Sequence, residues 1–139
     1  MKKIYSSLAA TSAMTAFSYI FSLLAGKNLR EPHILAQLIA RLMPWQNKKK
    51  NILTGWFLHY AVGLLFTEMY ILFWRNSASR NEKKTGLIFG GLAGLSAILI
   101  WKFTLSAHPF SPAINFGLFS LNLFLAHIIF GLVTSLTIP

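Results

Sequence analysis

Two histidines inside strongly apolar segments are the residues of this chain best suited to chemistry. His59 lies in the apolar run 52–74, and His127 lies in the apolar run 119–138. An ionisable side chain within a membrane helix is costly to insert, faces the protein interior and marks a candidate functional site. Imidazole exchanges protons near neutral pH and also ligates metal ions and haem iron. The pair therefore predicts a proton-sensitive or ligand-binding site inside a membrane protein.

Three interpretations of these histidines are open. In the first, each imidazole hydrogen-bonds a hydroxyl or a backbone carbonyl and holds helices together, at about 0.6 kcal/mol per bond. In the second, His59 and His127 contact a small solute or exchange protons along an interior path. In the third they are axial ligands of haem b, and Gly63 and Gly131, each four residues further on, make room for the porphyrin. No metal site is predicted, because zinc needs three or four ligands.

Helical periodicity places further polar side chains beside the two histidines. Tyr70 shares a helix face with His59, so we expect it in the interior. Thr134 shares a face with His127 in the same way. The two apolar runs are predicted to be parallel, because another span returns the chain between them. The two imidazoles are therefore predicted at similar depth.

Glu68 is the one acidic residue inside a predicted span. It follows His59 by nine residues, which places it on the opposite face of a regular helix and excludes a dyad with that histidine there. Two interpretations are open. Glu68 is either a carboxylate near the membrane surface that pairs with Arg75 or Lys83, or a proton or cation site between helices.

Four apolar segments long enough to cross a bilayer must position these residues. A hydrocarbon core about 30 Å thick needs about 20 apolar residues in a helix. Charged residues make up only 12% of the 139-residue chain, against about 25% in a soluble domain. We therefore predict an all-α, polytopic membrane protein with one domain over 1–139 and four transmembrane helices that form two hairpins. The predicted spans are 4–25, 52–74, 86–105 and 119–138.

A short amphipathic helix is predicted over residues 32–43, between the first two spans. Pro32 suits its first turn. His33, Gln37 and Arg41 recur on one face, and apolar side chains occupy the opposite face. The segment is too short to cross a bilayer. We expect it at the membrane interface or as a cap over the mouth of the bundle.

Small residues predict where the helices pack. Gly86, Gly90 and Gly94 form a doubled GxxxG pattern in the third span, and the first span carries Ala9 and Ala13 among many small residues. Lipid provides no hydrophobic force between helices, so small residues that allow close approach of backbones mark packing faces. We expect the first and third spans to pack closely at the centre of the bundle.

The net charge of +10 reflects topology rather than nucleic-acid binding, because the basic residues gather at span ends and in loops. They are predicted to meet anionic lipid headgroups. An even number of spans places both termini on one side, but the basic residues divide too evenly to fix the orientation. Without cysteines the chain has no disulfide. The lysines predicted to contact headgroups are Lys48, Lys49, Lys50, Lys83 and Lys84.

A resemblance covers the last three spans. Its features are His59 followed by the aromatic Tyr70, a third span opening with Gly86-Leu87-x-x-Gly90, a turn with two prolines, and a last span with Ala126-His127-x-x-Phe130. In these features the chain resembles the YagU-like proteins, a group of bacterial inner-membrane proteins of unknown biochemical activity. The resemblance implies a multi-pass protein of the bacterial inner membrane and no particular mechanism.

These patterns favour a membrane protein that is not an enzyme. Only three acidic residues are present, and no nucleophile or phosphate-binding motif is found. We expect a small protein that binds or passes a small solute or protons through an interior containing His59 and His127, with no cofactor. Two alternatives are open. One is a b-type haem-binding membrane cytochrome that uses both histidines. The other is a structural subunit of a homo-oligomer or of a larger membrane complex.

Overall fold

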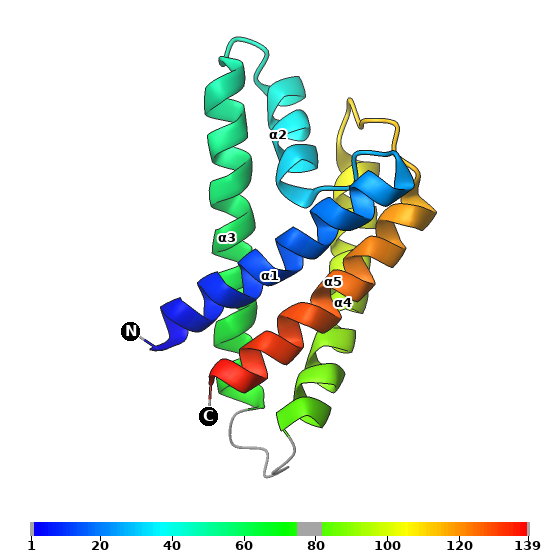
Figure 1. Cartoon of the computed structure of the whole chain (residues 1–139). Helices are drawn as coiled ribbons and strands as arrows, with labels where there is room; N and C mark the ends of the chain where they lie inside the picture. Colours follow the sequence, from blue (N-terminus) through cyan, green and yellow to red (C-terminus); the bar gives the residue numbers. More distant parts are fainter. Residues whose placement is uncertain (1, 75–81, 139) are drawn as a thin grey trace.

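The computed structural model describes residues 2–74 and 82–138, and the regular secondary structure of these residues is helical (Figure 1). Four of the helices, α1, α3, α4 and α5, are long and apolar enough to cross a membrane, and a short helix, α2, lies between the first two. The predicted four-span helical membrane protein is therefore confirmed. The helices are α1 (Lys2–Ala25), α2 (Glu31–Leu42), α3 (Lys48–Phe73), α4 (Glu82–Ala107) and α5 (Phe116–Thr137).

Local capping sets several helix ends beyond the apolar runs. Asn47 accepts a hydrogen bond from the backbone N–H of Lys50 at 2.8 Å and starts α3 four residues before the predicted span. Asn115 accepts one from the N–H of Leu118 at 3.0 Å and starts α5 in the same way. At the end of α1, Gly26 has φ +62°, a conformation that favours glycine and terminates the helix.

The helices run in the directions that the sequence predicts. α3 and α5 run in the same general direction with α5 inclined to α3, and α4, which lies between them in the sequence, runs back the opposite way (Figure 1). Near the two ends of the chain, the hydroxyl of Ser6 in α1 hydrogen-bonds that of Thr137 in α5 at 2.5 Å. Both termini therefore lie at the same end of the bundle, as four spans require.

The prediction that the first and third spans pack closely is wrong. α4 packs mainly on α5, whereas α1 crosses α3 and α5. The GxxxG pattern of α4 is a packing face, but its partner is a glycine in α5. A Cβ at Gly131 would meet Gly90 Cα at 2.7 Å, and a Cβ at Gly90 would meet Ile128 Cα at 2.8 Å. Gly131 lets the backbone of α5 fill the groove that Gly86 and Gly90 leave on α4.

The packing face of α1 is also turned slightly from the predicted one. Ala9 and Ala13 are half-buried at its edge, whereas Ala10 is fully buried. The buried side of the helix is lined mainly by hydroxyl-bearing side chains, which can bond across to α3 and α5. These buried residues are Ser6, Ser7, Thr11, Thr15, Ser18 and Ser22.

The outer surface of the bundle is covered by large apolar side chains. Water does not favour so many exposed apolar groups, whereas a bilayer does. This distribution agrees with the four membrane spans. Leu24 is 85% exposed, and similar side chains are found on all four spanning helices, including Leu23, Phe57, Leu72, Leu99, Phe103 and Leu136.

α2 lies lengthwise against α3, with its first turn in the interior of the bundle (Figure 1). Glu31 and Ile34 are buried, and Arg41 at the other end of the helix is exposed. Gly55 of α3 makes the contact possible, because a Cβ there would meet the backbone N of Ala36 at 2.9 Å. The short helix thus carries its N-terminus and its one acidic residue into the protein.

Candidate functional site

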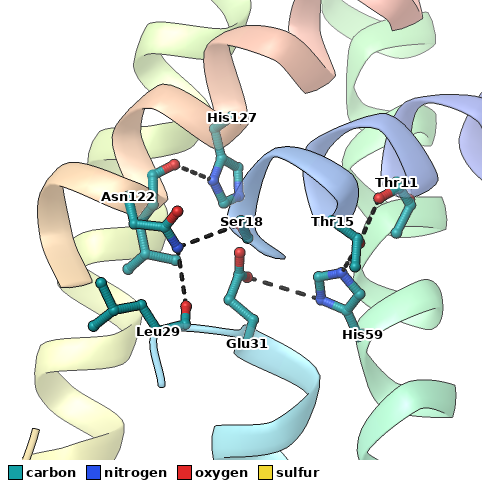
Figure 2. A network of polar contacts seen from close by, with 9 residues as sticks. Thr11, Thr15, Ser18, Leu29, Glu31, His59, Asn122 and His127 are labelled. Carbon is teal, nitrogen blue, oxygen red and sulfur yellow. Dashed lines mark hydrogen bonds and ion pairs between the residues drawn. The ribbon is translucent and has the colours of Figure 1, made fainter. Parts of the chain in front are cut away.

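Three ionisable side chains from three different helices converge in the interior of the bundle. Glu31 comes from α2, His59 from α3 and His127 from α5, and each is at most 6% exposed. Figure 2 shows the carboxyl group of Glu31 directed between the two imidazole rings. Its Oε2 lies 3.8 Å from Nδ1 of His59, and all three residues line the same cavity. The structure therefore joins the two predicted histidines to a carboxyl group that sequence reasoning did not assign to the site.

A hydroxyl group of α1 fixes the orientation of the His59 ring. Thr15 donates its only hydroxyl proton to the backbone carbonyl of Thr11 at 2.6 Å. Its Oγ1 must then accept the hydrogen bond of 2.8 Å that joins it to Nε2 of His59 (Figure 2). Neutral His59 therefore carries its proton on Nε2 and presents the lone pair of Nδ1 to Glu31.

The backbone of α5 fixes the other imidazole. Nδ1 of His127 donates to the carbonyl of Leu123 at 2.7 Å, so in the neutral ring Nε2 is an acceptor. The rings of Phe66 and Phe130 pack around the imidazole, with centroids 5.7 and 6.4 Å away. The bond to Leu123 occupies Nδ1 alone, and the His127 side chain lines the cavity. One acceptor of His127 thus remains for a ligand or water.

Burial determines the electrostatics of Glu31. Burial raises the pKa of Glu31 from 4.5 to about 8, so at neutral pH its carboxyl group is mostly protonated. Its Oε1 has no hydrogen-bond partner within the described parts of the chain. The preceding residue, Arg30, hydrogen-bonds Asn28 at 3.1 Å and lies 4.9 Å from the centre of the Tyr19 ring. The guanidinium group of Arg30 is therefore engaged with Asn28 and Tyr19.

A buried amide holds the connection between α1 and α2 against α5. The side-chain Nδ2 of Asn122 donates to the hydroxyl of Ser18 at 3.2 Å and to the carbonyl of Leu29 at 3.0 Å (Figure 2). The N–H of Leu29 in turn donates to the hydroxyl of Ser22 at 3.1 Å. These bonds fix the backbone two residues before Glu31. Asn122 therefore positions the carboxyl group without contacting it.

The cavity beside the three ionisable groups has a volume of about 120 Å³. An apolar cavity of roughly 150 Å³ holds a molecule the size of benzene, so this cavity has space for a small head group or a few waters. Its walls are largely apolar and come from α2, α3 and α4. Besides the three ionisable residues, the lining side chains are Leu35, Val62, Phe66, Ala97, Ile100, Trp101 and Thr104.

Two other residues predicted for the interior are buried but lie outside this cavity. Tyr70 is 4% exposed and packs edge-on against Phe89, with ring centroids 5.1 Å apart. Thr134 is fully buried, and its hydroxyl has no hydrogen-bond partner among the described residues. Neither side chain lines the cavity. The structure thus places both in the core and brings neither to the histidines.

Glu68 lies away from the site, as its position on the helix predicts. Its carboxylate pairs with Lys3 of α1 at 2.6 Å, and its side chain is 35% exposed. Arg75, one of the two predicted partners, lies outside the described residues. The pair joins α1 to α3 near the end of the bundle that carries the termini.

The glycines near the histidines are occupied by helix packing. A Cβ at Gly63 would collide with the hydroxyl of Thr11, and a Cβ at Gly131 would collide with Gly86 and Gly90. They therefore do not provide the space for a porphyrin that the haem interpretation requires. Within the described residues, no group of three His, Cys, Asp or Glu is placed to bind a metal ion.

One sequence signal could have identified Glu31. It precedes Pro32 at the start of the amphipathic helix, and it shares a helix face with Ile34 and Leu38, which are three and seven residues further on. All four residues are buried. An acidic residue on the apolar face of a short helix is a sign of a buried carboxyl group. The polar face with His33, Gln37 and Arg41 does not indicate this carboxyl group.

Comparisons of the chain with protein-family models, with curated proteins and with solved structures found no match. The resemblance to the YagU-like proteins therefore stays a prediction. The four membrane spans and the geometry around Glu31 carry the functional argument.

Proposed function

We propose that this membrane protein binds or passes a small solute or protons through an interior site formed by Glu31, His59 and His127. The carrying observation is the carboxyl group of Glu31, which is buried between two imidazoles and has an oxygen without a hydrogen-bond partner among the described residues. A buried polar group that serves only stability is normally satisfied by hydrogen bonds. In a membrane protein such a group is expensive and marks a solute or proton site.

The arrangement supports exchange of a proton between two groups. In its protonated form Glu31 directs an O–H toward Nδ1 of His59, across the 3.8 Å that separate the heavy atoms. A small approach of the two groups would allow the proton to move to the imidazole, leaving a carboxylate beside an imidazolium. Thr15 accepts from the opposite nitrogen in both states. The hydroxyl group therefore holds the ring in place while its charge changes.

The contacts of His127, unlike those of His59, favour a binding role over a purely structural one. The bond between His59 and Thr15 joins α3 to α1, so His59 has a structural role as well. The bond between His127 and Leu123 stays within α5 and joins no helices. A structural role does not explain why this second imidazole is buried against the same cavity.

The proposal includes a location and a mode of action. The protein is placed in the bacterial inner membrane, as the resemblance to the YagU-like proteins implies, and it acts without chemical conversion of its ligand. The cavity of about 120 Å³ is too small to be a continuous path across a bilayer by itself. Transport would therefore require a change of shape or a second copy of the chain.

Infrared spectroscopy of the protein in nanodiscs tests the protonation state of Glu31. The chain has only three acidic side chains, Glu31, Glu68 and Glu82, so the C=O stretch of a protonated carboxyl group is readily assigned. We expect this band at neutral pH, its loss as the pH rises through about 8, and its absence from Glu31→Gln. The matched control, Glu68→Gln, should leave it unchanged. A wild-type spectrum without the band at neutral pH would contradict the proposal.

A further inference from the structure

The cavity opens toward the lipid on the side of the bundle. Its inner end is formed by Glu31, His59 and His127, which are almost fully buried. At the other end, Val62 of α3 is 46% exposed and Ile100 of α4 is 57% exposed. Val62 lies in the middle third of α3, a helix long and apolar enough to span the membrane. The mouth of the cavity, defined by Val62 and Ile100, is therefore surrounded by acyl chains rather than water.

The polar end of the cavity offers mainly hydrogen-bond acceptors. Neutral His59 presents Nδ1, neutral His127 presents Nε2, and Glu31 presents Oε1. The only donor among these groups is the carboxyl proton of Glu31. A ligand that has only acceptors, such as a carboxylate or a phosphate, would face these acceptors with no proton between them. A ligand with several N–H donors and no acceptor is complementary.

The ammonium form of a primary amine has this composition. It carries three donors, no acceptor and a positive charge. The aromatic rings of Phe66 and Trp101 line the cavity and are favourable neighbours for a cation. Its alkyl chain would extend along the apolar lining toward the mouth between Val62 and Ile100.

We propose that the site binds a lipophilic primary amine, which enters from the bilayer and places its nitrogen between Glu31, His59 and His127. This inference rests on the proposed function, because it uses the same carboxyl group. The amine enters as a neutral base dissolved in the lipid. Its nitrogen lone pair takes the proton of Glu31, so one O–H bond breaks and one N–H bond forms. The products are an ammonium and a carboxylate in contact, and the net charge of the site does not change.

The groups around Glu31 allow this transfer. Among the described residues of α3 and α5 that line the cavity, the titratable ones are His59 and His127, and the described residues of α4 that line it are uncharged. From α1, the hydroxyls of Thr15 and Ser18 lie nearby (Figure 2). On the N-terminal side of α2, Arg30 and His33 contact the ring or hydroxyl of Tyr19 rather than the carboxyl group. Glu31 is thus the one group at the cavity that can become an anion.

Calorimetry with octylamine tests the proposal on the full chain in nanodiscs, with 1-octanol as the uncharged ligand of equal chain length and empty nanodiscs as background. In water near pH 7 octylamine is protonated, so binding must release the proton of Glu31 to the buffer. The measured binding enthalpy changes with the ionisation enthalpy of the buffer in proportion to the number of protons released. Titrations in several buffers therefore give this number. We expect about one proton released per amine at pH 7, none well above pH 8, and none for octanol.

Two pairs of variants make the test specific. Glu31→Gln should abolish proton release and weaken octylamine binding by about tenfold or more, because it removes the charged partner of the ammonium. Glu68→Gln should change neither. Ile100→Trp should block the mouth and weaken binding while it leaves the infrared band of Glu31 intact, and Leu99→Trp, at an exposed position outside the cavity, is its control.

The outcomes separate this inference from the function on which it rests. Equal binding of octylamine and octanol without proton release would overturn the amine site, even if the infrared band of Glu31 titrates as expected. Octylamine binding that Ile100→Trp leaves unchanged would overturn the lateral entry. Absence of a protonated carboxyl band in the wild-type protein would overturn both proposals.

Discussion

Oε2 of Glu31 lies 3.8 Å from Nδ1 of His59, although 28 residues and most of one helix separate them along the chain. Two hydrogen-bonded anchors create this proximity. Thr15 in α1 holds the imidazole of His59. Asn122 in α5 holds the backbone just before α2. The relationship predicts how stability, ring chemistry and local mobility respond to substitution.

The stability of the protein should depend on pH through Glu31. Its pKa is about 8 in the folded protein and 4.5 when the carboxyl group is exposed. Below pH 4.5 both states are protonated and burial carries no ionic cost, whereas between pH 4.5 and 8 only the unfolded state loses the proton. The free energy of unfolding should therefore fall by about 1.4 kcal/mol per pH unit as the pH rises through this window, up to about 5 kcal/mol in total.

Glu31→Gln removes this dependence and should therefore be more stable than wild type at pH 8, but not at pH 4.5. Unfolding in mixed micelles at several pH values measures the difference. Glu68→Gln is the control, since the exposed pair with Lys3 contributes at most about 1 kcal/mol. An equal effect of Glu31→Gln at both pH values would contradict the buried, protonated carboxyl group.

Thr15→Val should destabilise the protein and release the ring of His59. The substitution keeps the shape of the side chain but removes the acceptor for Nε2–H, which costs about 1–3 kcal/mol when a buried donor loses its partner. Nitrogen NMR of the labelled histidine should show loss of the preference for the Nε2–H tautomer. Ser12 is in α1 like Thr15, and Ser12→Ala removes its exposed hydrogen bond to Tyr60 of α3. This control should leave the His59 signal unchanged.

Gly90→Ala should destabilise the contact between α4 and α5. The added Cβ would lie 2.8 Å from the Cα of Ile128, and backbone atoms cannot move aside as a flexible side chain does. We expect a loss of about 1–3 kcal/mol. Gly91→Ala is a matched control, because its Cβ would meet only the side chain of Ile128 at 3.8 Å. Similar unfolding curves for the two variants would contradict the packing described for α4.

Asn122→Leu should loosen the connection that carries Glu31. It removes the bonds to Ser18 and to the carbonyl of Leu29 while it keeps a similar volume. Hydrogen exchange of the peptide that contains residues 27–31 should become faster than in wild type. Asn51→Leu, which removes a long bond of 3.5 Å to Gln46 elsewhere in the chain, should leave that peptide unchanged. Unchanged exchange in Asn122→Leu would show that the amide does not hold the loop.

The four spans and the two histidines could be predicted because both depend on composition along single helices. Long apolar runs identify spans, and an imidazole inside such a run must face inward. In α3, the residues His59, Gly63, Phe66 and Tyr70 are all buried. These inferences need only the periodicity of one helix and the cost of polar groups in lipid.

The helix partners and the third member of the site depend on contacts that no single helix specifies. Gly90 correctly indicates a packing face, but only the matching Gly131 shows that α5 occupies it. Residue type alone indicates Ala9 and Ala13 in the first span, although the rotation of the helix buries Ala10 instead. Glu31 belongs to a segment too short to span a bilayer, for which the sequence predicts a place at the membrane interface or over the mouth of the bundle, whereas the structure buries its first turn.

The short helix α2 also makes the two halves of the molecule unequal. It packs beside the first half of α3, where Gly55 receives it, whereas α1 crosses α3 further along, where Lys3 pairs with Glu68. The two halves of α3 therefore have neighbours of different length, the short α2 beside the first and the spanning α1 beside the second.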